Sequence, residues 1–530
     1  MGLDTRWAVA HSPKLLQGAM AGVCDYYAFG LALRAFGAAA AGWALLFQVL
    51  SWFNFYCLVR PYSNSAEAVL ATAALFHWAP HFLSGPAAPT TAAAKGAEVG
   101  DESPGGGGRG AGGGETCALL LAALCVAVRP TSAALWTMVG LFRLSTLPLR
   151  RWPRYLALTV LPPVASVVGA SFYLDSRLYG TATLVPLNFL RFNVLEGNSR
   201  IFGEQTWHWN FSQGLPAVLG AALPAALLGF ARPSYGEEGR GLGCGSRGSH
   251  RRLGWLAVWF LVYHSSSPHK EFRFLLPVLP IAHTYAGWAV SALVARAGPA
   301  SKCSSSSGSQ SSDLARAPKR QKKLRTAIWV GLFFLHVPAA IYLSVWHQSG
   351  ALSAVDAVAR RIPKLQPAVV AERHGLVAVH FLTPCHSAPL HSHLHFRGSE
   401  GGRWSGKVSL WSLDCSPKNR ELPGGSESDK FQADTLAFLE STYALADEEA
   451  QNENDVSTAV PTPDLAVMYD THLARPGVAE FLRDRLGLEP VEEHFNAHVN
   501  GDADSDDTHR SVHVFERMHA PRLSCAARSV

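Results

Sequence analysis

Residues 272–295 read FRFLLPVLPIAHTYAGWAVSALVA, an almost unbroken apolar run. A helix needs about 20 mainly apolar residues to cross the hydrocarbon core of a bilayer, so this run is long enough to span one. Weaker candidates are residues 15–35 and 117–147, the second of which is interrupted at Arg129-Pro130. The other clear runs are residues 36–59, 66–85, 156–174, 214–231, 253–265 and 326–346. We therefore expect an α-helical polytopic membrane protein.

The composition supports a membrane protein. Of the 530 residues, 48% are hydrophobic and only 16% are charged, against about 25% charged residues in an ordinary soluble domain. The formal charge of +6 comes from basic residues scattered between apolar runs, unlike the clustered basic face of a nucleic-acid-binding protein. Nine cysteines over this length also exclude a disulfide-dense secreted scaffold.

The distribution of Lys and Arg predicts the orientation in the membrane. Short loops on the cytosolic side of membrane proteins are enriched in these residues. The loops 150–154, 232–252 and 296–325 together carry sixteen of them, whereas the alternate loops 175–213 and 264–271 carry four. The first set of loops is therefore predicted to be cytosolic, and the second set to lie on the opposite side.

We predict two parts of the chain. Residues 1–347 form a multi-span membrane domain with low-complexity linkers at 86–116 and 301–325, which are too rich in Gly, Ser and charge to bury a core. Residues 348–530 contain no span and follow the last one, so alternation places them opposite the cytosol. They mix short apolar runs with acidic stretches, and we expect a small α/β appendage there.

The first candidate binding region lies in the loop 175–213, where polar residues occur beside aromatic ones. Trp and Tyr at this level are equally typical of the aromatic belt at a membrane interface. In the functional interpretation, an arginine pairs with an anion, asparagine amides bond hydroxyl groups, and indoles stack on a sugar ring. The candidate residues are Asn188, Arg191, Asn193, Trp207, His208, Trp209 and Gln213.

The second candidate region precedes the apolar run 272–295. Ionisable groups at a membrane boundary are costly unless they pair with each other or with a ligand, so they predict a functional site. The alternative is a Lys/Arg anchor that reaches the interface while paired with Glu271. The ionisable residues here are His264, His269, Lys270, Glu271 and Arg273.

A metal site is the weaker interpretation of a third pattern. His391, His393 and His395 alternate as on a strand, one face of which could bind zinc with His386 and Cys385. A purely structural strand is favoured, because no Cys-x-x-Cys or His-x-x-x-His partner follows. We expect no metal site, and the absence of a Gly-Lys-Ser/Thr phosphate loop argues against an ATP-driven pump.

Two motifs resemble those of a known family. The stretch from His269 to Pro280, HKEFRFLLPVLP, resembles the signature of the endoplasmic-reticulum mannosyltransferases that use dolichyl-phosphate-mannose, a glycosyltransferase family 22-like group. Arg129-Pro-Thr131 resembles the Arg-Pro-Thr element of the same family. Further stretches resemble the members that add the third mannose to the glycosylphosphatidylinositol (GPI) precursor, namely residues 188–193, 207–216, 384–389, 392–395 and 413–417.

The resemblance implies a GT-C glycosyltransferase fold with a lumenal C-terminal appendage, in the endoplasmic-reticulum membrane with a lumenal active site. It implies transfer of an α1,2-linked mannose from dolichyl-phosphate-mannose to the GPI precursor, both lipid-linked substrates, without a cofactor. Inversion at the anomeric carbon calls for one carboxylate base, for which Asp175 and Glu271 are candidates. The phosphate leaving group needs a cationic cradle. Candidates for that cradle are Arg191, His269, Lys270 and Arg273, with Arg129 as a further binding residue.

The chain departs from the family at its beginning. The resemblance starts near Pro13, at what looks like the second span of the family. We therefore expect the first span, and the acidic loop with its catalytic Asp, to be missing, so that this chain lacks the family's base. Other interpretations are a mannosyltransferase of the dolichol-linked N-glycan precursor and a noncatalytic scaffold or transporter. Whether Cys385 and Cys415 form a disulfide stays open.

Overall fold

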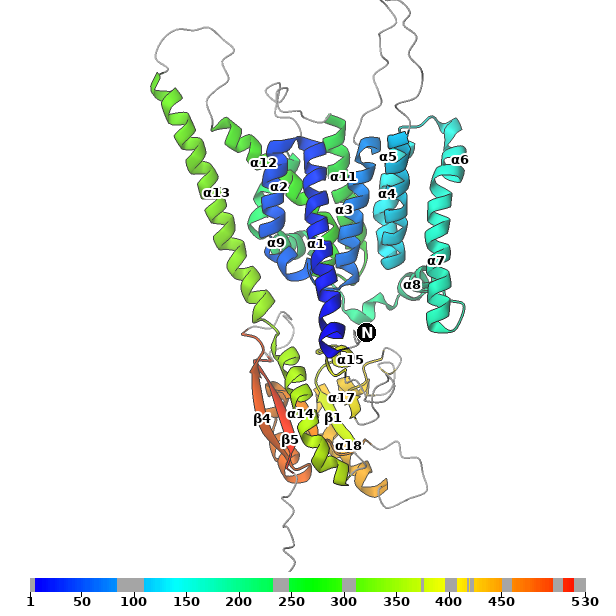
Figure 1. Ribbon diagram of the computed structural model, residues 1–530, viewed down its shortest axis with the longest axis vertical. Helices are drawn as coiled ribbons and strands as arrows, with labels where there is room; N and C mark the ends of the chain where they lie inside the picture. Colours follow the sequence, from blue (N-terminus) through cyan, green and yellow to red (C-terminus); the bar gives the residue numbers. More distant parts are fainter. Residues whose placement is uncertain are drawn as a thin grey trace, which may run out of the picture. The chain divides into compact units, whose positions relative to one another are not determined.

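The chain forms two compact units in the computed structural model (Figure 1). One unit comprises residues 14–341 and the other combines residues 1–13 with residues 342–530. We refer to them as the helical unit and the terminal unit. The structure describes residues 5–82, 109–231, 247–297, 311–372, 376–395, 408–416, 419, 424–449, 460–498 and 509–518.

The helical unit is built from long helices joined by short helical turns. Its longer helices are α1 (Arg6–Phe36), α2 (Ala38–Leu50), α3 (Ser63–Phe82), α4 (Arg109–Val128), α5 (Ala133–Leu144), α7 (Leu161–Tyr179), α10 (Leu223–Ala231), α11 (Arg247–Ser266), α12 (Leu279–Arg296) and α13 (Ser311–Val345). The shorter elements are η1 (Asn54–Leu58), η2 (Pro130–Ser132), η3 (Leu149–Arg151), α6 (Trp152–Tyr155), η4 (Leu156–Val160), α8 (Val185–Leu190), η5 (Arg191–Leu195), η6 (Asn198–Phe202), η7 (Asn210–Gly214), α9 (Leu215–Leu219), η8 (Gly220–Ala222) and η10 (Phe272–Val278).

Four helical stretches of the described residues are long and apolar enough to cross a membrane. They are Leu149–Tyr179, Asn210–Ala231, Phe272–Arg296 and Pro318–Leu365, which contain the predicted spans 156–174, 214–231, 272–295 and 326–346. Most of the other predicted apolar runs also lie in helices, but these helices carry polar groups on their inner faces, such as Gln48 in α2 and Glu67 in α3. The predicted helical membrane protein is therefore confirmed.

The interruption at Arg129-Pro130 is also confirmed. Helix α4 ends at Val128, Arg129 has an extended backbone, and Pro130 begins the turn η2 that leads into α5. Proline lacks the N–H that would continue the helix, and it disfavours the helical conformation of the preceding residue. The run 117–147 is thus two helices with Arg129 held at the break.

Two predicted linkers are partly helical. Helix α4 begins at Arg109, inside the linker predicted at 86–116, and α13 begins at Ser311, inside the linker predicted at 301–325. The segment 314–325 is rich in Leu, Ala, Lys, Arg and Gln, which are good helix formers, so high charge there does not prevent a helix. Residues 86–108 and 301–310 lie outside the described residues.

The spans differ in what surrounds them. The apolar window of Phe272–Arg296 is 72% buried within the protein, whereas that of Leu149–Tyr179 is 6% buried. Helix α12 is therefore a core helix, and most of the α7 surface is available to lipid. In Figure 1, α6 and α8 lie at opposite ends of the helical unit, so α7 leads from the basic segment 150–154 to the candidate loop 175–213.

Small residues allow α12 to approach α2 closely. A Cβ atom added to Gly287 would lie 2.4 Å from the backbone nitrogen of Ala44 and 2.6 Å from the carbonyl oxygen of Ala40. Membrane helices associate largely through such close packing of small residues, because lipid provides no hydrophobic drive between them. This contact fixes α12, and with it the segment that immediately precedes it.

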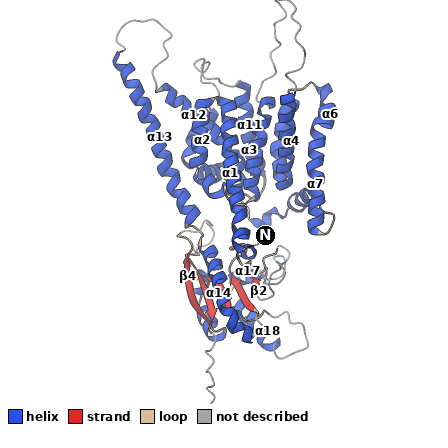
Figure 2. Cartoon of the chain, in the orientation of Figure 1, coloured by secondary structure: helices blue, strands red, loops and turns tan. Residues whose placement is uncertain are grey.

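The terminal unit contains a five-stranded sheet with helices on both faces (Figure 2). The strand order is β2-β1-β3-β5-β4, in which β1 runs parallel to β2 and β3, and β5 runs antiparallel to β3 and β4. The strands are β1 (Val377–Leu382), β2 (Val408–Ser412), β3 (Leu465–Tyr469), β4 (Leu488–Phe495) and β5 (Ser511–Arg517). The helical elements are α14 (Gly350–Glu372), α15 (Leu390–His393), α17 (Glu427–Ala433), α18 (Thr435–Glu449), α19 (Asp470–Leu473), α20 (Val478–Glu480) and η11 (Phe481–Arg485).

Alternation along the strands explains the two layers of helices. In β1, Val379 and Phe381 pack with Val358 of α14, whereas the following residue, Leu382, belongs to the core with Phe431 of α17. Successive side chains of a strand point to opposite faces, so an apolar strand is covered on both sides. The expected α/β appendage is therefore confirmed.

The strand expected across the three alternating histidines is wrong. His391 and His393 lie in the short helix α15, and Cys385 forms a disulfide with Cys415. A bonded cysteine has no thiolate for a metal, so the zinc interpretation with Cys385 fails. The disulfide joins the loops that follow β1 and β2.

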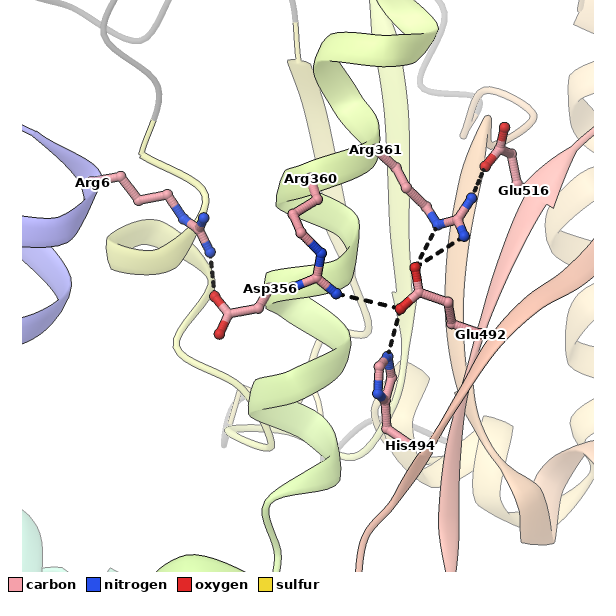
Figure 3. A network of polar contacts seen from close by, with 7 residues as sticks. All are labelled: Arg6, Asp356, Arg360, Arg361, Glu492, His494 and Glu516. Atoms are coloured by element: carbon pink, nitrogen blue, oxygen red, sulfur yellow. Dashed lines mark hydrogen bonds and ion pairs between the residues drawn. The ribbon is translucent and has the colours of Figure 1, made fainter.

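The N-terminal residues of the terminal unit are fixed by an ion pair. Arg6 donates to the carboxylate of Asp356 on α14 (Figure 3). It also donates to the backbone carbonyl of His393. Arg6, in the first turn of α1, is therefore bonded to two residues that lie more than 300 positions later in the sequence.

A second ionic network fastens α14 to the antiparallel edge of the sheet (Figure 3). Arg361 donates to Glu492 at 2.9 Å and to Glu516 at 2.5 Å, and His494 lies 3.3 Å from Glu492. Burial opposes ionisation of Glu492, but the bonds and charge of Arg361 hold its pKa below the ordinary value. This carboxylate is therefore ionised at neutral pH.

Replacing Arg361 with methionine should destabilise the terminal unit by about 1 kcal/mol at pH 7, a value reduced by the partial exposure of the pair. The pKa of a glutamate in the unfolded chain is about 4.3, and the Arg361 pair lowers it in the folded protein. The pair therefore stabilises the fold fully above about pH 4.3, and this stabilisation is lost as the pH falls through the lower pKa of the folded state. The effect of the substitution on thermal unfolding should therefore be larger at pH 7 than at pH 3. Arg360→Met is the control, because Arg360 is more exposed and lies 3.4 Å from Glu492. Equal effects of both variants would contradict this account.

Candidate active site

Glu271 is the last residue of the segment that joins α11 to η10. Its carboxylate accepts from His269 Nε2 at 2.9 Å and from Arg273 Nη2 at 2.7 Å, and Arg273 Nε lies 2.6 Å from its second oxygen. Burial opposes ionisation, but the bond from His269 and the charge and bond of Arg273 hold the pKa of Glu271 below its ordinary value. Glu271 is thus an ionised carboxylate that positions the side chains of His269 and Arg273.

Arg129 reaches the same place from the break between α4 and α5. Its Nε lies 3.0 Å from a carboxylate oxygen of Glu67 on α3, and its guanidinium lies 4.5 Å from the ring centre of Phe274. The Arg273 guanidinium lies 5.4 Å from the ring of Tyr62, and the charges of Arg273 and Glu271 act on Arg129. Guanidinium groups over aromatic faces gain cation–π attraction while their N–H groups stay available. We call Glu67, Arg129, His269, Glu271 and Arg273 the ionic cluster.

Lys270 has a different role from its neighbours. It is buried, and its Nζ donates to the carbonyl oxygens of Gln205 at 3.1 Å and Ser267 at 2.5 Å. Burial lowers its pKa. The Gln205 N–H donates to the Pro268 carbonyl at 2.9 Å, and His269 Nδ1 lies 3.3 Å from the Gly203 carbonyl. Lys270 therefore attaches the 203–209 loop to the ionic cluster.

Only part of the Trp207-His-Trp motif packs near this segment. Trp209 is buried, with its ring centre 4.8 Å from that of Phe272. Trp207 is 72% exposed, and His208 is exposed and bonds Ser212 at 2.9 Å. Gln213 is also exposed. Trp209 thus contributes to packing, while Trp207 keeps its indole free of the protein core.

The residues of the 188–193 stretch make contacts of their own. Arg191 is exposed and pairs with Glu196 at 2.9 Å. Asn188 is exposed, and Asn193 donates to the Phe189 carbonyl at 3.1 Å. The structure therefore gives Arg191 and Asn193 local partners outside the ionic cluster.

Two further predicted ionisable residues have local partners. Asp175 accepts from Ser171, one helical turn earlier in α7, at 3.0 Å. His264 is buried at the end of α11, where its Nδ1 lies 3.0 Å from the carbonyl oxygen of Phe260 in the same helix. Neither contact connects these residues to the ionic cluster.

Sequence reasoning missed Glu67 and Asn64. Glu67 is a single carboxylate inside an apolar run, and such a residue usually has a functional or pairing role, which was the available signal. Asn64, one turn earlier on α3, has its amide beside the Arg129 guanidinium; with its oxygen turned toward Arg129 it accepts from both Nη atoms at 3.3 Å. These two residues complete the surroundings of Arg129.

An apolar cavity of about 300 Å³ lies among α4, α5 and α7. Its walls include Leu119, Val126 and Ala127 of α4, Trp136 of α5, and Val164 and Val168 of α7. Arg129 follows the wall residue Ala127 by two residues, so the ionic cluster begins just beyond the α4 wall, although none of the cluster residues lines the cavity itself. An apolar space that ends near fixed cations suits a molecule with a hydrocarbon chain and an anionic head.

Comparison with known proteins supports an enzyme. The model of the Alg9-like mannosyltransferase family matches residues 1–395. This chain belongs to that family. The match begins before Pro13, earlier than the resemblance in the motifs suggests. The protein is a mannosyltransferase, as the sequence motifs predict.

Similar proteins come from plants, fungi and animals. Mannosyltransferase APTG1 of Arabidopsis thaliana is 29% identical over 98% of this chain and 80% of its own length. GPI mannosyltransferase 3 of Yarrowia lipolytica is 28% identical over 95% of this chain and 81% of its own length. GPI alpha-1,2-mannosyltransferase 3 of Homo sapiens is 28% identical over 83% of this chain and 64% of its own length. Among solved structures, ArnT from Cupriavidus metallidurans in the apo state is 15% identical, and the match covers 95% of this chain and 83% of the ArnT chain with a TM-score of 0.49.

Proposed function

We propose that this mannosyltransferase transfers mannose from dolichyl-phosphate-mannose in α1,2 linkage to the GPI precursor, as its third mannose. The observation that carries the proposal is the set of relatives named GPI mannosyltransferase 3, one of which aligns with 95% of the chain. The ionic cluster adds support, because a lipid phosphate leaving group needs positioned cations.

The proposed reaction assigns a part to each group of the site. The prenyl chain of the donor lies in the apolar cavity beside α4, and its phosphate faces Arg129 and Arg273. Cations aimed at the phosphate stabilise the charge that develops as the bond to the anomeric carbon breaks. Inversion requires a carboxylate that removes the proton of the acceptor hydroxyl. Both oxygens of Glu271 are occupied by its neighbours, so we propose Glu271 as a positioning group and leave the base unassigned.

Transfer assays in microsomes test the function. Microsomes from cells deficient in the third GPI mannosyltransferase, containing the expressed protein, receive labelled dolichyl-phosphate-mannose. A labelled GPI intermediate with three mannoses should appear, and an α1,2-specific mannosidase should release the label. Label found only in dolichol-linked N-glycan precursors would instead support the alternative acceptor and reject the GPI proposal.

We also propose an endoplasmic-reticulum location with the ionic cluster and the terminal unit on the lumenal side. The basic loops favour this orientation, and the Cys385–Cys415 disulfide suits an oxidising compartment. In sealed microsomes, protease should remove a tag at Ser306 and leave a tag at Val530 intact. Detergent is the control, since it should expose both tags. Protection of the Ser306 tag would reverse the orientation.

A further inference from the structure

The Arg129 guanidinium is held on several sides. Glu67 pairs with its Nε at 3.0 Å, Asn64 lies beside its Nη atoms, and the ring of Phe274 lies 4.5 Å away. Its side chain is only 16% exposed. An arginine has many rotamers, and fixing one of them requires this kind of enclosure. The guanidinium therefore has one orientation before any substrate arrives.

Glu67 is itself fixed. Its side chain is 1% exposed and accepts a hydrogen bond from the Ser132 hydroxyl, which comes from the turn that follows Arg129. Cys125 at the end of α4 lies 3.3 Å from the same hydroxyl. The carboxylate is thus connected to α4 and η2 at once. Because it is buried and engaged on both sides, it has no access to an acceptor hydroxyl and does not serve as the catalytic base.

A buried ion pair of this kind is costly to maintain for stability alone. Removing two charges from water costs several kcal/mol per ion, and apolar residues of similar volume often stabilise a fold as well or better. Glu67 also lies among apolar neighbours of α3, such as Ala68 and Val69, where a hydrocarbon side chain would fit the pattern. The pair therefore calls for a role in addition to joining helices.

We propose that Glu67 is a positioning residue for mannosyl transfer, which orients the Arg129 guanidinium toward the phosphate of the lipid-linked donor. This inference rests on the proposed function. The carboxylate pairs with Nε of Arg129, and the Asn64 amide, also on α3, lies beside its Nη atoms, so the two α3 residues together fix the plane of the guanidinium. A displacement of about 1 Å in such a group can reduce the rate about 100-fold. Glu67 therefore acts on the reaction through Arg129 alone.

The test compares Glu67→Gln, Glu67→Asp and Arg129→Lys in transfer assays with dolichyl-phosphate-mannose, normalised to folded protein. Glu67→Gln should lower kcat/KM for the donor about 10- to 100-fold. Glu67→Asp, which keeps the carboxylate, should retain much more of the wild-type kcat/KM than Glu67→Gln does. The double variant Glu67→Gln with Arg129→Lys should be no worse than the poorer single variant, because the two residues act as one unit.

A matched control exists in the same helical unit. Glu115 forms another poorly exposed ion pair, with Arg143 at 2.7 Å, and also accepts from Tyr155 at 2.8 Å. Glu115→Gln should lower the melting temperature without changing kcat/KM for the donor. If Glu67→Gln behaves in the same way, or if its effect multiplies with that of Arg129→Lys, Glu67 only joins helices and the proposal is wrong.

Failure of the proposed function gives a different result. In that case the wild-type protein transfers no mannose from this donor to the GPI precursor. Binding of dolichyl phosphate to the detergent-solubilised protein, measured by native mass spectrometry, remains a test of Glu67. A dissociation constant at least tenfold higher for Glu67→Gln than for Glu115→Gln supports the positioning role, and equal constants overturn it.

Discussion

Replacing Glu271 with glutamine should lower mannose transfer by about 10²- to 10³-fold, the usual effect of losing one positioned electrostatic group. Glutamine keeps the size of the side chain but removes the charge that holds His269 and Arg273. The measurement is the ratio of GPI intermediates with two and three mannoses, normalised to protein abundance.

Glu204→Gln is the control for this variant. Glu204 forms an exposed pair with Arg200 in the loop that contacts the cluster, so its loss should change the rate less than about twofold. If the polar residues before α12 only anchor the chain at the membrane interface, Glu271→Gln will be nearly silent. Any loss in Arg273→Ala will then follow protein abundance, which would remove the cluster from the site.

Gly287→Val should prevent α12 from packing against α2. The new side chain would overlap backbone atoms of Ala40 and Ala44, which cannot move without displacing the whole helix. Overpacking of ordinary cores costs about 1 to 3 kcal/mol, and a clash with backbone belongs at or above the upper end of that range. Most of the expressed protein should fail to elute as a single species in size-exclusion chromatography in detergent.

Gly42→Val adds the same side chain to α2 at a position where a Cβ atom meets nothing within 4 Å. This variant should resemble the wild-type protein in elution and melting temperature. Similar behaviour of both glycine variants would show that the close approach of α2 and α12 is not required for folding.

The membrane fold was largely predictable because its signals are local. Apolar runs such as 156–174 and 326–346 identify helices exposed to lipid, and Pro130 identifies the break. Helices inside the bundle are harder to delimit, because polar residues such as Gln48 and Asn54 find hydrogen-bond partners inside the protein. The apolar run predicted at 36–59 is longer than the helix that it contains, because α2 ends at Leu50.

The candidate site was predictable only as a set of residue types. The sequence favours His269, Glu271 and Arg273 as ionisable groups at a membrane boundary, but it contains no information on which helix lies opposite them. Glu67 and Arg129 are 62 positions apart, and their pairing depends on how α3 packs beside α4. The same limit explains Lys270, whose direction toward the backbone of Gln205 follows from the path of a distant loop.

The contacts of Arg6 also have a consequence for the order of events during synthesis. Its partner Asp356 is 350 residues later in the chain. At translation rates of about 5 to 20 residues per second, the ribosome needs roughly 20 to 70 seconds to progress from one to the other. Throughout that interval the first turn of α1 has no carboxylate of α14 to bind. The first turn of α1 therefore reaches its final surroundings only after residue 356 has been synthesised.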